Sequence, residues 1–124
     1  MDSTLNSFST DALLNMDATE IAHYIKAKKL TSEFITRTYI NHINKVNPIL
    51  NAVVENRFDL AIEEAIQCDQ ENNKNKMNLP LFGVPISIKE SFNVKGMHTT
   101  GGIVHRKDIR MNEDALLMRF CLIL

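Results

Sequence analysis

The chain has 124 residues, with 14 Lys plus Arg against 15 Asp plus Glu, and 44% of the residues are hydrophobic. A chain of this length suits one domain and buries about two thirds of its unfolded surface on folding. The formal net charge is -1 and no long run carries one sign, so the sequence offers no basic surface for a phosphate backbone and excludes nucleic acid as an expected partner.

Residues 1–12 are expected to form an N-terminal tail. The opening MDSTLNSFSTD carries an acid at position 2 and no apolar run, unlike a secretory signal. The longest apolar stretch is the C-terminal LLMRFCLIL, which Arg119 interrupts and which is shorter than the roughly 20 residues of a membrane span. We therefore expect no transmembrane segment and a cytoplasmic location.

Cysteines and histidines show no metal-binding spacing. Cys68 and Cys121 lie far apart and form no CxxC pair, which favours reduced thiols in an intracellular compartment. The four histidines show no HExxH pattern and are expected to have structural or surface roles. They are His23, His42, His98 and His105. The sequence thus implies neither a metal nor a cofactor.

Helix-start signals dominate residues 13–70, the expected helical part. Asp17 with Glu20 three residues later resembles a capping box and predicts a helix over residues 18–29. Thr31 can cap a second helix, whose apolar residues recur at helical spacing, and Pro48 is expected to end it.

The next segments show less regular patterns. The run Ala52 to Val54 fits either a strand or an extended connector. Apolar residues from Phe58 onward predict a third helix ending near Gln70. Residues 71–78, rich in Asn and Lys, predict a surface loop.

Residues 79–124 are expected to contain a lysine-bearing strand and a last helix. In the stretch PISIKES, alternate residues point to opposite sides of the expected strand. Ile86, Ile88 and Glu90 lie on one side, and Ser87, Lys89 and Ser91 on the other. Asn112 can cap the last helix, with Met111 and Leu116 in the positions of a hydrophobic staple.

The segment PLFGVPISIKESFNVKGMHTTGG resembles the first sequence block of the amidase signature family, serine hydrolases that cleave carbon–nitrogen bonds in amides. The residues KESF in this segment are more similar to the fatty-acid amide hydrolase branch of that family. The likeness runs from Leu13 to Arg119, with IAHYIKAKKLTSEF, NPILNAVVENRFDLAIEEA and NEDALLMRF in family order. It covers nearly all of this chain but only the amino-terminal part of such an enzyme.

The resemblance implies an α/β fold, a mixed β-sheet flanked by helices, and a Ser, cis-Ser, Lys catalytic triad. The catalytic lysine of the family lies in the pattern G-[IV]-P-[IV]-[ST]-[ILV]-K-[DE], which the chain matches from Gly83 to Glu90. Lys89 corresponds to that lysine, the general base. The two serines belong to a GGSSGGE-type signature that these 124 residues lack. The chain is therefore expected to be an inactive amino-terminal fragment of an enzyme for small-molecule amides.

A lysine can accept a proton only when its amine is neutral, and an unperturbed pKa of about 10.4 prevents this at neutral pH. Burial between Ile86 and Ile88 would lower the pKa of Lys89. The alternative is a lysine on an edge strand that reaches into water. A local dyad of Lys89 with Ser87 or Ser91 is disfavoured, because side chains two residues apart on a strand stand roughly 7 Å apart.

Other interpretations remain open at this point. The apolar tail from Leu116 to Leu124 could make the chain a non-catalytic binding or regulatory module that docks on itself or on a full-length relative. The resemblance also extends to one component of a glutamine amidotransferase, although those relatives usually have Lys-Asp-Asn where this chain has KES. Glu90 is expected to pair with a cation or cap a turn, and the TTGG segment to form a turn near the resembled active site. A full-length relative could also associate peripherally with a membrane.

Overall fold

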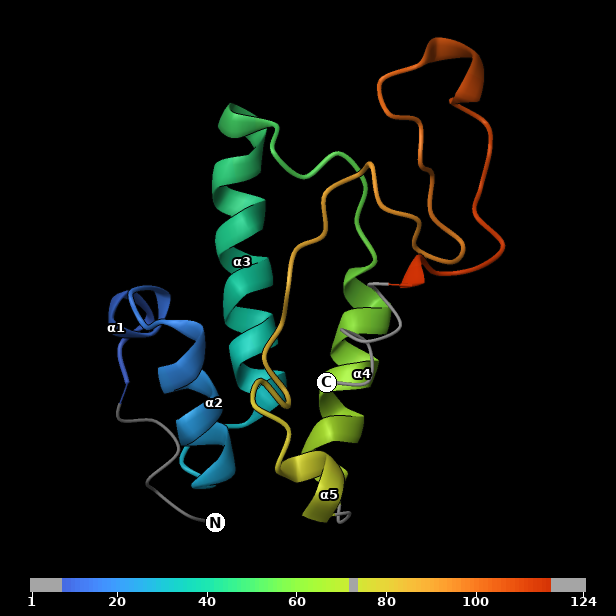
Figure 1. The fold of residues 1–124 in the computed structure, drawn as a ribbon. Helices are drawn as coiled ribbons and strands as arrows, with labels where there is room; N and C mark the ends of the chain where they lie inside the picture. The colour runs from blue at the N-terminus through green and yellow to red at the C-terminus, as the bar shows by residue number, and fades with distance from the viewer. Residues whose placement is uncertain (1–7, 72–73, 117–124) are drawn as a thin grey trace. The chain divides into compact units, whose positions relative to one another are not determined.

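The computed structural model describes residues 8–71 and 74–116, and helices form most of its regular structure (Figure 1). The described residues divide into two compact units. The first contains residues 8–52, 57–71 and 74–85, and the second contains residues 53–56 and 86–116. Among the described residues, no helix has the length and apolar content needed to cross a membrane.

The first two helices start at polar side chains that cap their amide groups. Helix α1 (Thr10–Leu14) begins after Ser9, whose Oγ accepts the Ala12 N–H at 3.1 Å, and it occupies part of the expected tail. Helix α2 (Ala18–Lys26) has the predicted capping box. Asp17 Oδ1 accepts the Glu20 N–H at 2.8 Å, and Glu20 Oε2 accepts the Asp17 N–H at 3.0 Å.

Helix α3 (Ser32–Leu50) is capped by Thr31, as predicted, but it does not end at Pro48. Proline lacks the N–H that would bond one turn back, yet a single missing bond near the end of a long helix is tolerated. The last turn is closed instead by the Asn51 N–H, which donates to the Asn47 carbonyl at 2.7 Å. The helix ends because Asn51 adopts a left-handed conformation with φ +47°.

Helix α4 (Phe58–Gln70) has the predicted bounds and packs beside α3 in the first unit (Figure 1). The run Ala52 to Val54 is a connector without strand structure. Within the segment predicted as a surface loop, the chain forms the short helix α5 (Lys74–Met77).

The core of the first unit is apolar and lies among its first three helices. Its central cluster consists of four fully or almost fully buried side chains, Leu13, Ile21, Leu30 and Ile35. Partly buried residues pack around them, including Phe8 and Tyr24, whose rings meet edge to face at 5.0 Å. Val84 also packs against this core, so the beginning of the lysine segment belongs to the first unit.

A buried polar contact fixes the glycine that starts the lysine pattern. Ser32, at the start of α3, is 2% exposed, and its Oγ donates to the Gly83 carbonyl at 2.5 Å. The Asp69 carboxylate on α4 accepts the N–H groups of Ser32 and Glu33 at 2.7 and 2.9 Å. One carboxylate thus satisfies two amides at the start of α3, where helices have no internal acceptors.

The expected α/β class is wrong for the part of the chain that the structure describes, because these residues form no β-sheet. Their strand-like pairing is limited to an isolated antiparallel bridge between His98 and Arg110. The segment expected as the lysine strand is extended, but residues 86–88 have no backbone hydrogen bond within the described residues. Alternation of side chains suits a strand, but a strand also needs a neighbour for its N–H and C=O groups.

The second unit consists of loops joined by hydrogen bonds and contains the 3₁₀ turn η1 (Val104–Arg106). Two backbone bonds cross it, from the Gly96 N–H to the Met111 carbonyl at 2.8 Å and from the Met111 N–H to the Met97 carbonyl at 2.9 Å. Residues 113–115 are not helical, contrary to the expected capped helix. The remainder of that helix and the apolar tail after Leu116 lie outside the described residues.

Candidate functional site

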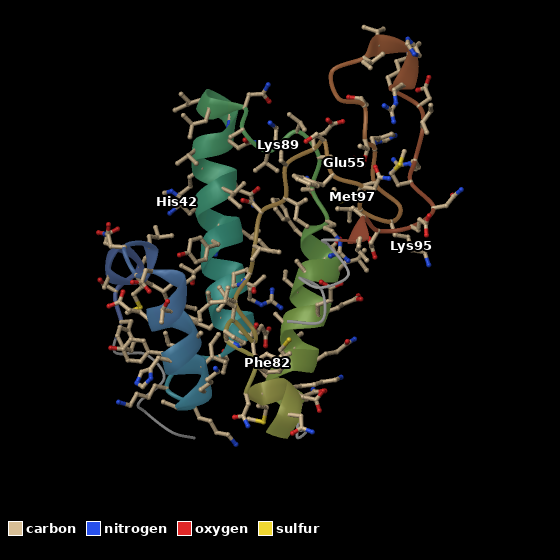
Figure 2. The ribbon with its side chains drawn as sticks, in the orientation of Figure 1. His42, Glu55, Phe82, Lys89, Lys95 and Met97 are labelled. Atoms are coloured by element: carbon tan, nitrogen blue, oxygen red, sulfur yellow. The ribbon has the colours of Figure 1, made fainter. Side chains whose placement is uncertain are left out.

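Lys89 lies on the extended segment of the second unit (Figure 2). Its side chain is exposed to solvent. The expected burial is not found, because Ile86 is itself 51% exposed and Ile88 is only half-buried. Within the described part of the chain, the Lys89 amine makes no ion pair or hydrogen bond. Its neighbours Ser87 and Ser91 are exposed as well. Nothing described in this unit removes the amine from water.

The backbone immediately after Lys89 is ordered by a tight turn. The Phe92 N–H donates to the Lys89 carbonyl at 2.9 Å, and the Thr99 hydroxyl donates to the Phe92 carbonyl at 3.3 Å. Thr99 is 5% exposed, and Val94 next to the turn is 7% exposed. The lysine therefore sits at the edge of a packed turn even though its own side chain is in water.

Glu90 caps a second turn, which is one of the two roles expected from the sequence. Its two carboxylate oxygens accept the backbone N–H groups of Thr100 and Gly101, the latter at 3.1 Å. The hydrogen bonds from Thr100 lower the pKa of Glu90, because they stabilise the ionised carboxylate. The N–H groups of the TTGG segment thus bind an anion supplied by the chain itself.

Glu55, on the connector between α3 and α4, contacts two residues of this unit, His98 and Arg110. Its Oε2 accepts the His98 N–H at 2.9 Å, and its Oε1 lies 3.1 Å from His98 Nδ1 and 3.2 Å from Arg110 Nη1. Arg110 also donates to the Gly96 carbonyl at 2.6 Å. One carboxylate therefore ties the connector to both sides of the loop over residues 96–110.

Two opposed effects set the pKa of Glu55. Partial burial raises it, but the backbone and side-chain hydrogen bonds from His98, the charge of His98 and the contact with Arg110 outweigh this effect. The net result is a pKa below the ordinary value of a glutamate. Glu55 is consequently ionised in the folded protein at neutral pH.

The carboxylates of Glu55 and Glu90 line a common open pocket of about 620 Å³. The other lining residues are Val54, His98, Thr100, Gly102 and Lys107. All belong to the second unit, whereas the adjacent Lys89 is not part of the lining. Because both carboxylates are already hydrogen-bonded to backbone amides, the pocket is a structured concavity and not a set of unpaired acids.

No pattern in the sequence points to Glu55. It follows a short run that fits either a strand or a connector, and its partners His98 and Arg110 are 43 and 55 residues further along the chain. The spacing of His98 indicates only that it is not a metal ligand. No local periodicity or capping pattern connects residues so far apart, so a contact of this kind emerges only from the folded structure.

Comparison with known proteins adds the family context. The Amidase family model matches residues 34–121. Fatty-acid amide hydrolase 2-A of Danio rerio is 38% identical over 113 residues, which is 86% of this chain and 21% of that protein. Human fatty-acid amide hydrolase 2 is 33% identical over 116 residues, 88% of this chain and 22% of that protein.

A plant relative with a less specific name also matches. A probable amidase of Arabidopsis thaliana is 35% identical over 96 residues, 76% of this chain and 19% of that protein. The chain thus spans about a fifth of the length of the curated relatives that it matches.

Proposed function

This chain belongs to the amidase signature family, and we propose that it is the amino-terminal portion of an amide hydrolase to which it contributes Lys89 as the general base. The observation that carries this proposal is the match of Gly83 to Glu90 to the family's lysine pattern, inside the region matched by the family model.

The proposed chemistry is acyl transfer through a serine. The neutral lysine amine takes a proton, through the cis-serine, from the nucleophilic serine as that serine attacks the amide carbonyl. The amine then returns the proton to the leaving nitrogen as the carbon–nitrogen bond breaks and an acyl-enzyme forms. Water then hydrolyses the ester bond of the acyl-enzyme, which releases the carboxylic acid and restores the serine. Both serines would come from polypeptide beyond the 124 residues, because the chain contains no GGSSGGE-type signature.

The exposed position of Lys89 bears on this proposal. The chain represents about a fifth of the length of its relatives, and we propose that the remaining polypeptide of a full-length enzyme covers Lys89 and removes its amine from water. The chain alone is then expected to be inactive, both because it lacks the nucleophile and because its amine is solvated.

A chimaera tests the role of Lys89. Residues 8–116 replace the matching part of the zebrafish fatty-acid amide hydrolase 2-A, and kcat is measured with a fatty-acid amide. Lys89→Met should lower kcat by about 10²- to 10⁴-fold, the usual contribution of general acid–base catalysis. Lys95→Met, which removes an exposed lysine of the same unit, is the matched control and should leave kcat within about twofold. Equal activity of the two variants contradicts the proposal.

The isolated chain provides the complementary test. Incubated with a fatty-acid amide, a small aryl amide and a serine-directed fluorophosphonate probe, it should show neither turnover nor labelling. Turnover that disappears in Lys89→Ala would instead show a complete catalytic site within the chain. Fatty-acid amides are the proposed substrate class because the relatives with 33 and 38% identity carry that activity in their names.

A further inference from the structure

We propose that Glu90 is the positioning residue for Lys89: its carboxylate fastens the backbone beside the lysine to the turn over residues 99–102. This inference rests on the proposed role of Lys89 and extends it to a residue that takes no part in proton transfer. All of the contacts involved lie within the second unit.

Within the described residues, the backbone leading to Lys89 makes no hydrogen bond that would hold the lysine in place. Residues 86–88 have no backbone hydrogen bond within the described chain. Ile86 is 51% exposed, so its packing is weak. Among the described residues, the backbone hydrogen bond to the Lys89 peptide comes from its C-terminal side.

That side carries a connected set of hydrogen bonds. The Phe92 N–H bonds to the Lys89 carbonyl, and the Thr99 hydroxyl bonds to the Phe92 carbonyl. Glu90 adds two bonds to the next two amides, those of Thr100 and Gly101. The turn over residues 89–92 and the turn over residues 99–102 consequently form one hydrogen-bonded structure. Glu90, next to the lysine, is the charged link between them.

The conformation of the 99–102 turn suits a carboxylate. Gly101 and Gly102 both have positive φ, of +58° and +76°, and successive amides in such turns form a concave site for an anion. Gly102 N–H bonds to the Thr100 hydroxyl at 3.1 Å. The N–H groups of Thr100 and Gly101 then remain for Glu90.

The isosteric substitution Glu90→Gln tests this link directly. A glutamine has the same shape, but only one of its terminal atoms accepts hydrogen bonds. Its NH₂ group would face one of the two amide donors, so at least one bond is lost. Asp108→Asn, which alters an exposed acid of the same unit, is the matched control for the loss of one charge.

The first measurement uses the full 124-residue chain. Amide hydrogen exchange of Phe92 reports the turn that contains the Lys89 carbonyl, and the amides of Thr100 and Gly101 report the link itself. In Glu90→Gln all three should exchange at least tenfold faster, whereas Asp108→Asn and Glu90→Asp should change Phe92 less than threefold. Unchanged protection of Phe92 in Glu90→Gln overturns the proposal.

The second measurement separates positioning from general stabilisation, using the chimaera described above. Glu90→Gln should lower kcat by about ten- to a hundredfold, the usual effect of a misplaced catalytic group, with KM within threefold and recovery in Glu90→Asp. If Lys89→Met is inactive but Glu90→Gln keeps full kcat, this inference fails and the proposed function stands. If Lys89→Met keeps full kcat, the proposed function fails, while the exchange of Phe92 still decides whether Glu90 holds the turn.

Discussion

Gly83 is required at its position for two separable reasons. Its φ of +78° lies in the left-handed region, which costs a residue with a side chain about 1–2 kcal/mol. A Cβ there would also lie only 3.3 Å from both Ile25 Cδ1 and Ser32 Cβ. Gly96 has almost the same φ, +83°, but no atom of the described residues lies within 4 Å of a Cβ built on it. The two glycines therefore separate backbone strain from crowding.

We expect Gly83→Ala to destabilise the first unit by more than Gly96→Ala destabilises the second. Both variants carry the backbone cost, and overpacking at Gly83 adds about 1–3 kcal/mol. The measurement is urea unfolding followed at amides of the unit that contains each glycine. Equal losses of unfolding free energy in the two variants would show that Ile25 and Ser32 move aside at no cost. Only the backbone conformation would then matter.

The lowered pKa of Glu55 predicts how the stability of the protein depends on pH. Its pKa is lowered in the folded protein, so its contribution is fully present above the ordinary glutamate pKa and is lost as the pH falls through the lower folded value. The unfolding free energy of the native chain relative to Glu55→Gln should be constant above about pH 5 and shrink below 4.5. A stability difference between the native chain and Glu55→Gln that grows in acid would reverse the assigned shift of Glu55.

At the scale of elements, α3 is held at its start by a side chain from another helix. Thr31 caps it locally by accepting the Phe34 N–H at 3.1 Å, and Asp69 on α4 accepts two further amides. A carboxylate at this end also interacts favourably with the helix dipole. The contact therefore couples the formation of α3 to its packing against α4.

Asp69→Asn should lower the free energy of unfolding by about 0.5–2 kcal/mol, the range measured for lost N-terminal caps. The asparagine keeps one acceptor but turns its NH₂ group toward the second amide. Glu63→Gln, an exposed acid of the same helix, should change stability by less than about 0.5 kcal/mol. Urea denaturation followed by far-ultraviolet circular dichroism provides the measurement. A loss no larger than that of Glu63→Gln would mean that water replaces the cap.

Elements whose signals are local in sequence could be predicted, and those that need a distant partner could not. The caps of Asp17 and Thr31 act within three residues, and the structure confirms both. The expected lysine strand is wrong because alternation says nothing about the presence of a pairing neighbour. The prediction that the helix ends at Pro48 is wrong, because a helix can lack one backbone hydrogen bond near its end.

The same distinction applies to the candidate site. The family pattern identifies Lys89, and a turn cap is among the roles expected for Glu90. The solvent exposure of Lys89 is not predictable from its own segment, because burial depends on what covers Ile86 and Ile88. Glu55 could not be identified from the sequence, because its partners are more than 40 residues away.

At the scale of the whole molecule, the two units are stabilised by different interactions. Among the described residues, the first has seven buried apolar side chains, and four of them form one cluster, Leu13, Ile21, Leu30 and Ile35. The second has Val94 as its buried apolar side chain among the described residues. Its loops are joined mainly by polar contacts, including those of Glu55 and Glu90 and the bond from the Lys95 N–H to Asp114 at 2.7 Å. Individual hydrogen bonds contribute only about 0.5–1.5 kcal/mol, less than a well-buried aliphatic side chain.

This contrast predicts that the second unit opens at lower free energy than the first. In native-state hydrogen exchange at neutral pH, the amides of Phe92 and Met111 should exchange faster, after correction for intrinsic rates, than that of Ile35, whose N–H bonds to the Thr31 carbonyl at 3.2 Å. Leu13→Ala serves as the reference, because loss of a fully buried leucine costs about 2–5 kcal/mol and should reduce the protection of Ile35. Protection of Phe92 and Met111 equal to that of Ile35 in the native chain would show that polar contacts alone give these loops the stability of a packed helical core.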